Sequence, residues 1–546
     1  MFKSIDLTFQ SIPKTPVLFY DYIYQFQKVR SFFPRDSSIK MTDPDGSNRL
    51  ISNAEDRCNL VEVLHRQNGA LGCGPKVVEN IQRLGGNRCF AVVTGQQVGL
   101  FTGPAYTIYK ALTAIKLAQE YSNQGLEAVP IFWMATDDHD LDEVCQTKLI
   151  STESCLEKFR YLANRETFQQ SVGKIQFEKS ITGILRNFLE TLPNSEFKPN
   201  LVRELNEAYS PGISFSEAFA KIFNFLFSEY GLILLNPQDP VLKNKSKSVF
   251  SKVAKEWLTL NNLLKTCEQE LNKSGYTPQV PVTTDTSFLF IEDEGKRRGL
   301  MCTSKGFQLK GTNKTLSLDA LTKLIETAPE RISPNVLLRP IVQDSILPTL
   351  AYVAGPSEVA YFAQLLPVYR IMNLEMPMIF PRTSLTIIEN RSEKILNRHQ
   401  LKFTDLFKGT TSALRSLLDS SVDESISLRF DEIKTNIAEH LGKMEELLKV
   451  VDPTLTGALG TTQKKIQYQI ESLQTKFSKA ELGKQRIVAR QIENVFNSLY
   501  PSNNLQEREI NFFYFLSRYG VGLISQLHEN INLYNLNHQL VYLSKS

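Results

Sequence analysis

The sequence lacks the features that mark secreted, zinc-binding or membrane-spanning proteins. Its 546 residues include only seven cysteines, an odd number, and no two of them form a CxxC pair. This scatter excludes a disulfide framework and gives no support to a structural zinc site. The longest apolar run, Ala128 to Ala135, is far shorter than the ~20 residues that a membrane-spanning helix needs.

The sequence also lacks a strong charge of either sign. Lys and Arg total 62 against 58 Asp and Glu, a net charge of +4, which argues against electrostatically driven nucleic-acid binding. The first residues, MFKSIDLTFQSIPK, have no apolar core of the signal-peptide kind. We therefore expect a cytoplasmic protein whose partners are small molecules, with no nucleic acid and no membrane involved.

What the sequence does contain is an alternation of strands and helices. The apolar run 89–94 predicts a buried strand, 105–121 has helical spacing, and 129–134 predicts a second strand. Such a strand–loop–helix–strand unit indicates an α/β fold with a parallel sheet and a right-handed crossover. Further strands are predicted at 231–237 and 377–380.

The length exceeds what one hydrophobic core accommodates, so we expect more than one domain. Residues 1–388 are predicted to form the α/β core, interrupted by polar insertions at about 150–215 and 265–335. Residues 389–504 are predicted to form an antiparallel coiled-coil domain. Residues 505–546 are expected to pack back on the core.

The coiled-coil prediction rests on a 4-3 spacing of apolar residues in two segments. The first segment carries Ile426, Phe430, Ile433, Ile437, His440, Met444, Leu447 and Val451, and the second Ile466, Ile470, Leu473, Phe477 and Ala480. The alternative is a pair of ordinary helices packed on the core. The almost uniformly polar intervening positions favour the coiled coil.

A glycine-rich loop between the first strand and its helix is the first candidate binding site. Its candidate ligand-binding residues are Thr94, Gly95, Gln96, Gln97, Gly99, Gly103 and Tyr106. A loop of this kind at a helix N-terminus is typical of a phosphate or anion site, because backbone N–H groups point toward the ligand. Lys110, further along the helix, is placed to reach back toward an anion. The alternative is a structural glycine turn.

An acidic cluster follows the second predicted strand, over residues 137–143. Parallel strands present their carboxyl ends at one edge of a sheet, so this cluster and the glycine-rich loop are expected to share one cleft. Asp138, His139 and Asp140 are the candidate catalytic residues, and Asp138 and His139 are candidates for orienting an amine nucleophile or contacting a magnesium-bound phosphate. The alternative is an acidic helix N-terminus, above all for Asp142 and Glu143.

A third group of polar residues follows further short apolar runs. Its members are Arg339, Asp344, Gly355, Glu358 and Arg382. Arg339 can pair with a substrate carboxylate, Glu358 can accept a hydrogen bond from a ribose or an amine, and Arg382 is placed to approach a triphosphate. An ordinary salt bridge or helix cap is the alternative for each.

Several of these segments together resemble one protein family. TGQQVGLFTGPAYTIYKALTAIKLA, VPIFWMATDDHDLDEV, AYVAGPSEVAYFAQL, MPMIFPRTS and QEREINFFYFLSRYG are similar to the family of cysteine-adding enzymes of bacillithiol biosynthesis. The resemblance spans nearly the whole chain. It implies a Rossmann-like, nucleotidyltransferase-type core with two connecting insertions, an antiparallel coiled-coil arm and a homodimer.

The resemblance also implies a reaction. The expected activity is ligation of L-cysteine to glucosaminyl-malate to form bacillithiol, with ATP activating the cysteine carboxylate and Mg²⁺ accompanying the phosphates. Two alternatives stay open. The run 137–140 could serve a metal-dependent hydrolase, or the chain could be a non-catalytic scaffold that presents its coiled coil to partners.

Overall fold

The structure is a computed structural model, and its described residues form two compact units. The described residues are 3–37, 54–164, 167, 169–412, 414, 424–452, 455–482 and 486–543. The larger unit comprises Ser4–Thr386 and Glu507–Leu540, and the smaller comprises Met1–Lys3, Ile387–Gln506 and Val541–Ser546. Residues 507–540 are therefore part of the same unit as the N-terminal two thirds of the chain.

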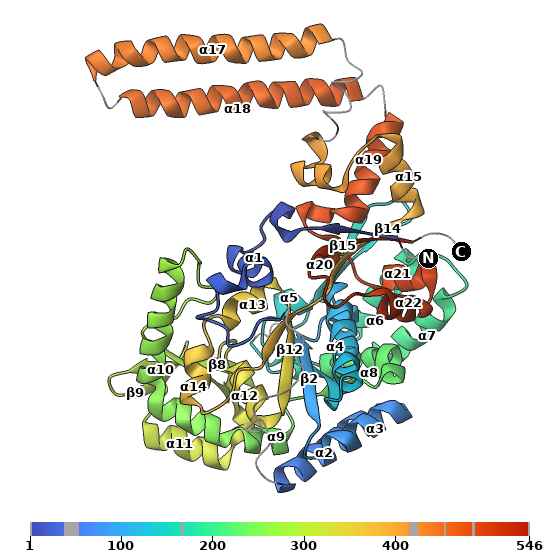
Figure 1. Ribbon diagram of the computed structural model, residues 1–546, viewed down its shortest axis with the longest axis vertical. Helices are drawn as coiled ribbons and strands as arrows, with labels where there is room; N and C mark the ends of the chain where they lie inside the picture. Colours follow the sequence, from blue (N-terminus) through green and yellow to red (C-terminus); the bar gives the residue numbers. More distant parts are fainter. Residues whose placement is uncertain are drawn as a thin grey trace. The chain divides into compact units, whose positions relative to one another are not determined.

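A five-stranded parallel sheet forms the centre of the larger unit (Figure 1). Its strand order is β13–β12–β2–β3–β6. The bounds are β2 Phe90–Gln96, β3 Ala128–Met134, β6 Ile233–Leu235, β12 Thr349–Ala354 and β13 Met378–Pro381. Nearly every residue of these strands is buried, as expected for a parallel sheet covered on both faces. The predicted α/β fold with a parallel sheet is confirmed.

The crossover between the first two strands is the predicted helix. Helix α4 (Tyr106–Asn123) connects β2 to β3 and packs against both. Aromatic rings fill another part of the core: Phe132 of β3 contacts Phe219 and Phe223 of α8 (Phe215–Phe227), with ring centroids 5.6 and 4.7 Å away. The continuous apolar runs of the strands thus pack against apolar side chains of the helices.

The order of the strands creates a switch point at the centre of the sheet. The chain runs from β2 through β3 to β6 on one side, and later adds β12 and β13 on the other side of β2. The connections that leave β2 and β12 therefore diverge. In open α/β sheets the crevice at the carboxyl ends of such a strand pair is the usual ligand site.

The two predicted insertions contain structure of their own. The region after β3 holds the antiparallel hairpin of β4 (Gln146–Ile150) and β5 (Leu156–Arg160). The later region holds a five-stranded antiparallel sheet in the order β10–β9–β8–β7–β11. Its bounds are β7 Thr286–Asp293, β8 Lys296–Thr303, β9 Gly306–Leu309, β10 Thr315–Leu316 and β11 Ile332–Pro334.

Further helices and three strands complete the larger unit. The helices are α1 Val17–Tyr24, α2 Ala54–Gly69, α3 Pro75–Leu84, α5 Leu141–Val144, α6 Ser180–Thr191, α7 Lys198–Ala208, α9 Pro240–Lys245, α10 Lys247–Lys273, α11 Leu318–Thr327, α12 Arg339–Ile346, α13 Pro356–Phe362, α14 Leu366–Ile371, α20 Gln506–Glu509, α21 Phe513–Tyr519 and α22 Gly522–Asn530. Strand β1 (Lys3–Leu7) lies largely within it, and β14 (Ser384–Glu389) and β15 (His538–Leu543) each have their first half in it. Within the described residues, no helix has both the length and the apolar character required to cross a bilayer.

The smaller unit is helical, with α15 Asn390–Arg398, α17 Glu424–Val451, α18 Leu455–Leu482 and α19 Arg486–Leu499. Helices α17 and α18 pack together, and Phe430 near the start of α17 contacts Phe477 near the end of α18 at a ring-centroid distance of 6.0 Å. Two long, mutually packed helices are what the spacing predicts.

The predicted seam between these helices is wrong in part. On α17 the apolar residues that are partly buried are Phe430, Ile437, Leu441 and Leu448. Predicted seam residues that are exposed instead are Ile433, His440, Met444, Leu447 and Val451, and Leu473 on α18 is exposed as well. The helix carries two neighbouring apolar stripes, and spacing alone does not decide which one faces α18. The side chains of Ile426 and Ala480 lie outside the described residues.

Candidate active site

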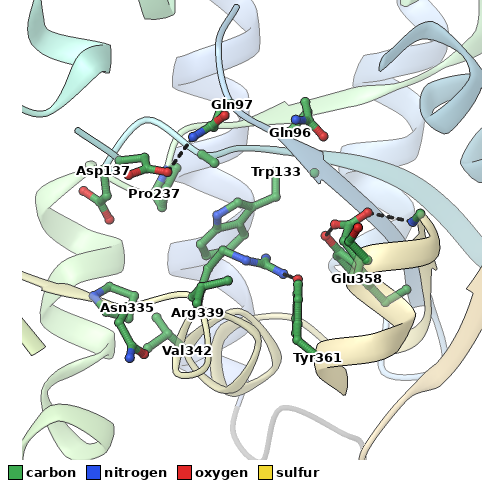
Figure 2. Close-up of a pocket in the computed structure, with 18 of the residues that line it drawn as sticks. Gln96, Gln97, Trp133, Asp137, Pro237, Asn335, Arg339, Val342, Glu358 and Tyr361 are labelled. Carbon is green, nitrogen blue, oxygen red and sulfur yellow. Dashed lines mark hydrogen bonds between the residues drawn. The ribbon is translucent and has the colours of Figure 1, made fainter. Parts of the chain in front are cut away.

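A cavity of about 620 Å³ lies at the carboxyl ends of β2, β3 and β12, at the switch point of the sheet (Figure 2). Its size is within the usual range for small-molecule sites. Of the residues predicted from the sequence, it is lined by Gly95, Gln96, Gln97, Tyr106, Lys110, Asp138, His139, Arg339, Gly355, Glu358 and Arg382. All three sequence clusters therefore contribute to one cavity.

A buried ion pair links the first and third clusters. The Nζ atom of Lys110, whose residue is only 3% exposed, lies 2.5 Å from Oε2 of Glu358. Lys110 also donates to the carbonyl oxygen of Gly95 at 2.8 Å and to Oε1 of Gln96 at 3.0 Å. Burial by itself would raise the pKa of Glu358, but the lysine and the N–H of Gly355 lower it overall. The lysine does reach back to the loop, and its charge is already balanced.

Arg339 is held mainly by neutral groups. Its guanidinium donates to Oε1 of Gln343 at 2.8 Å and to the hydroxyl of Tyr361 at 3.2 Å, and lies 5.1 Å from the ring centroid of Tyr352. No carboxylate lies within ion-pair distance of this guanidinium among the described residues. Its charge is therefore available to an anion in the cavity.

The acidic cluster after β3 is divided among separate partners. Asp137 pairs with Lys243 of α9, with the atoms 2.7 Å apart. Asp138 accepts a hydrogen bond of 2.6 Å from the side-chain amide of Gln97. Asp140 caps α5 by accepting from the N–H of Glu143. The like charges are thus kept apart, and burial together with Asp140 and Asp138 raises the pKa of Glu143.

His139 is fixed by a residue of the second insertion. Nη1 of Arg297, on β8, lies 2.7 Å from Nδ1 of His139 and 3.6 Å from Oδ1 of Asp138. The same guanidinium stacks 3.8 Å from the ring centroid of Phe290 and donates to Ser333 and Pro334. Burial and the arginine charge lower the pKa of His139, so the imidazole is neutral at pH 7.

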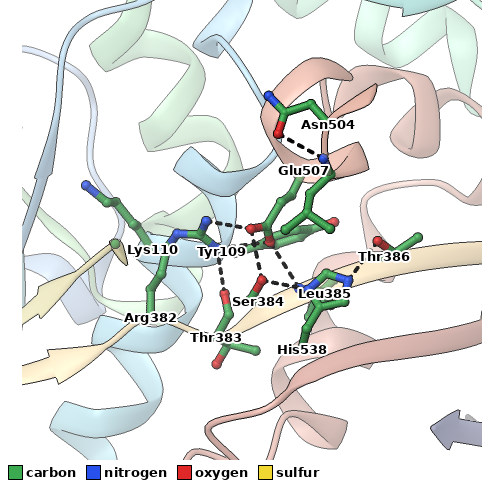
Figure 3. A network of polar contacts seen from close by, with 12 residues as sticks. Tyr109, Lys110, Arg382, Thr383, Ser384, Leu385, Thr386, Asn504, Glu507 and His538 are labelled. Atoms are coloured by element: carbon green, nitrogen blue, oxygen red, sulfur yellow. Dashed lines mark hydrogen bonds and ion pairs between the residues drawn. The ribbon is translucent and has the colours of Figure 1, made fainter. Parts of the chain in front are cut away.

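Arg382 is bound by Glu507 of α20, in the C-terminal part of the chain (Figure 3). Its guanidinium makes two hydrogen bonds with the buried carboxylate of Glu507, at 2.6 and 3.0 Å. The same carboxylate accepts from Ser384, which in turn contacts Nδ1 of His538 at 2.7 Å. Burial lowers the pKa of His538 to about 4. This network fixes the position of Arg382 beside the cavity.

The glycine-rich loop differs from its prediction. Gly99 and Gly103 do not line the cavity; a Cβ added at Gly99 would lie 3.1 Å from Cα of Gly103, so these glycines allow the loop to pack on itself. The start of α4 is covered by the C-terminal segment, because the N–H of Ala105 donates to Ile510 and the Asn511 side chain donates to Gly103. The N–H of Ala105 is therefore not available to a ligand, and of residues 94–103 only 95–97 line the cavity, together with Tyr106 of α4.

Three other predicted residues lie outside the cavity. Thr94 is fully buried and donates to the carbonyl oxygen of Val353 on the neighbouring strand. Asp140 is the α5 cap already described. Asp344 lies behind Arg339, where Tyr369 and Gln343 donate to it and burial raises its pKa. These residues stabilise the walls of the site.

Comparison with known proteins gives a family. Residues 5–383 match the family described as "Bacillithiol biosynthesis BshC, N-terminal Rossmann-like domain", and residues 385–543 match "Bacillithiol biosynthesis BshC, C-terminal coiled-coil domain". A protein of Salinibacter ruber named "Putative cysteine ligase BshC" is 32% identical over 527 residues, covering 96% of each chain. One of the same name from Koribacter versatilis is 34% identical and covers 94% of this chain and 95% of its own. This chain belongs to the BshC family of bacillithiol biosynthesis. The resemblance of its sequence motifs to that family is confirmed, as are the Rossmann-like and coiled-coil regions.

Sequence analysis missed several residues that line the cavity of this BshC-family protein. They are Trp133, Lys243, Phe290, Arg297 and Arg508. Trp133 is the last residue but one of the predicted strand 129–134, which precedes the acidic cluster, so its position was a usable signal. Arg508 lies within the motif QEREINFFYF, but nothing in the sequence places it beside residues 400 positions earlier. Lys243 and Arg297 have no local signal.

Proposed function

We propose that this chain is an ATP-dependent ligase that joins the carboxylate of L-cysteine to the amine of glucosaminyl-malate, giving bacillithiol through a new carbon–nitrogen amide bond. The names of its relatives support a cysteine ligase. The observation that carries the proposal is the cavity at the switch point of the sheet, which is lined by six cationic and four acidic side chains. The cationic residues are Lys110, Lys243, Arg297, Arg339, Arg382 and Arg508. The acidic residues are Asp137, Asp138, Glu143 and Glu358.

Amide formation in water requires a good leaving group on the carboxyl carbon. A carboxylate oxygen of cysteine attacks a phosphorus of ATP, giving either the adenylate with release of pyrophosphate or the acyl phosphate with release of ADP. The neutral amine then attacks the carbonyl carbon, the bond from that carbon to the phosphate oxygen breaks, and AMP or phosphate departs. The proton lost by the amine passes to a base or to water.

The cavity fits the phosphates better than it fits a resident metal ion. Arginine side chains match the geometry of phosphate oxygens, and Arg339, which is held mainly by neutral groups, lines the cavity. Asp137, Asp138 and Glu358 are engaged by Lys243, Arg297 and Lys110, and the described residues contain no cluster of three potential metal ligands. Mg²⁺ therefore enters the proposal as part of the nucleotide substrate, MgATP.

Other features belong to the same proposal. A nucleotidyltransferase-type core is supported by the position of the cavity at the switch point. An antiparallel arm is supported by the contact of Phe430 with Phe477. A cytoplasmic location is supported by the seven free cysteines. The homodimer rests on the family resemblance.

Neither alternative function is favoured by an observation. A metal-dependent hydrolase would need Asp137, Asp138 and His139 to converge on one ion, and each is instead held by its own partner. A non-catalytic scaffold would not need a cavity with this density of charged groups.

The test is incubation of the purified protein with MgATP, glucosaminyl-malate and cysteine labelled with ¹⁸O in its carboxylate. Bacillithiol, detected by mass, is the expected product. The ¹⁸O label would appear in AMP if an adenylate forms and in inorganic phosphate if an acyl phosphate forms. Absence of bacillithiol with wild-type protein that melts cooperatively would overturn the proposal. Asp142→Asn, an exposed neighbour that does not line the cavity, is a matched control and should remain active.

A further inference from the structure

The charged side chains of the cavity divide into those with an oppositely charged partner and those without. Four of the six cations pair with carboxylates: Lys110 with Glu358, Lys243 with Asp137, Arg297 with Asp138 and Arg382 with Glu507. Among the described residues, Arg339 and Arg508 have no such partner within 4.0 Å, and neither has Glu143. These three groups are therefore the ones that a charged substrate can satisfy.

Glu143 and Arg508 are brought to the same end of the cavity by contacts among three segments of the chain. The N–H of Ala105 donates to Ile510, and the N–H of Asn511 donates to the carbonyl oxygen of Lys148 at 2.8 Å. Lys148 also forms an ion pair with Glu509. Residues 104–106, 143–148 and 508–511 are thus held side by side.

Tyr106 lines the cavity together with both of these charged residues. Its hydroxyl accepts from Nε2 of Gln96 at 3.3 Å, and the guanidinium of Arg382 lies 5.5 Å from its ring centroid. Glu143 and Arg508 are the two charged groups that act most strongly on the pKa of Tyr106, although burial is the larger cause of its rise to about 12. The carboxylate and the guanidinium therefore both act on one phenol, and they do not form an ion pair with each other.

Arg508 is half-buried and Glu143 is exposed, and both line the cavity. Desolvation there raises the pKa of Glu143 and lowers that of Arg508, which Arg382 lowers further, so each unpaired charge carries a cost. A ligand that carries one positive and one negative group relieves both costs. A phosphate alone would be repelled by Glu143, and an amine alone would be repelled by Arg508.

We propose that Glu143, Tyr106 and Arg508 form the subsite for the α-amino acid substrate, with its ammonium group on Glu143 and its carboxylate on Arg508. This assignment rests on the proposed ligase function and names where its amino acid binds. Arg508 would hold the carboxylate that reacts, and Arg339 would remain for the phosphates or for the acidic second substrate.

Calorimetry with cysteine and two truncated analogues tests the subsite, with and without a non-hydrolysable ATP analogue. Cysteamine lacks the carboxylate, and 3-mercaptopropionate lacks the ammonium group. Glu143→Gln should raise the Kd of cysteine about tenfold or more and leave that of 3-mercaptopropionate unchanged. Arg508→Gln should raise the Kd of cysteine similarly and leave that of cysteamine unchanged. Asp142→Asn and Arg370→Gln, both exposed and outside the cavity, are the matched controls.

The outcomes separate the subsite from the ligase function. Wild-type protein that makes bacillithiol, with an unchanged KM for cysteine in both variants, would overturn the subsite and leave the function standing. The predicted analogue pattern in a protein that makes no bacillithiol would support the subsite and remove the function. If Arg508→Gln weakens ATP binding and spares cysteine, Arg508 is a phosphate ligand and the subsite is wrong. Failure of wild-type protein to bind cysteine under either condition would also overturn it.

Discussion

Nη1 of Arg297 lies 2.7 Å from Nδ1 of His139, and this contact determines what the histidine can do. A guanidinium only donates hydrogen bonds, so Nδ1 must be the acceptor and the imidazole proton resides on Nε2. A second proton would place a positive charge against Arg297. His139 is therefore suited to donate a hydrogen bond to a substrate oxygen and poorly suited to act as a base.

This assignment predicts different results for two substitutions of His139. His139→Ala should lower kcat/KM about 10- to 100-fold, the usual range for loss of a hydrogen bond to a charged group. His139→Gln should retain most activity, because its amide nitrogen approximates the position of Nε2–H. A pH–rate limb near neutrality that disappears in His139→Gln would show instead that the imidazole titrates during catalysis.

The Lys110–Glu358 pair predicts a loss of stability that a second substitution reverses. Glu358→Gln should lower the free energy of unfolding by about 3–5 kcal/mol, because it leaves the ammonium group of Lys110 buried and unpaired. Adding Lys110→Met should recover much of that loss by removing the unpaired charge. Urea denaturation measures both variants. Equal stability of the wild type and Glu358→Gln would show that water reaches this lysine.

The packing of the glycine-rich loop predicts that Gly99 matters for stability. Gly99→Ala should destabilise the fold by about 1–3 kcal/mol, since the new Cβ meets the backbone of Gly103. Nucleotide affinity per folded molecule should not change, because Gly99 lies outside the cavity. Gly183→Ala on α6 is the matched control, with no atom within 4 Å of the added Cβ. Weaker nucleotide binding by fully folded Gly99→Ala would restore the phosphate-loop prediction.

Because the imidazole of His538 is buried and neutral, we expect the free energy of unfolding to depend on pH. Its pKa is about 4 in the folded protein, against 6.5 in the unfolded chain, so the unfolded state binds more protons between these values. The free energy of unfolding should therefore fall as the pH drops from 6.5 to about 4, by about 3 kcal/mol in total. His538→Gln should remove this component of the slope, and His440→Gln, on the exposed face of α17, should not. Identical slopes for the wild type and His538→Gln would contradict the burial of a neutral imidazole.

The exposed stripe of α17 offers a test of the proposed homodimer. Light scattering at micromolar concentration should return about twice the 62.1 kDa chain mass. If the arm supplies the interface, Met444→Glu with Leu447→Glu should shift the protein toward monomer, because both side chains are exposed in the single chain and apolar. A wild-type mass near 62.1 kDa would refute the dimer.

The sequence by itself determined the central fold and the general location of the site. The apolar runs of β2, β3 and β13 and the helical spacing of α4 are local patterns, because a strand buried on both faces must be continuously apolar. The positions of Gln96, Asp138 and Glu358 directly after strands or at the following helix were enough to predict a common cleft. That inference needs only the rule that parallel strands end at one edge.

Only the tertiary structure decided which of these residues face the cavity and with what charge. The sequence suggests that Gly99 and Gly103 bind a ligand. In the structure, that part of the loop and the residue at the start of α4 instead contact Ile510 and Asn511, and neither glycine lines the cavity. Likewise, α17 presents two apolar stripes of similar spacing, and contact with α18 selects one. Arg297 and Arg508 reach the site from distant parts of the chain. Which charges are paired and which remain for a substrate is set by such long-range contacts, because pairing depends on distances that no local pattern contains.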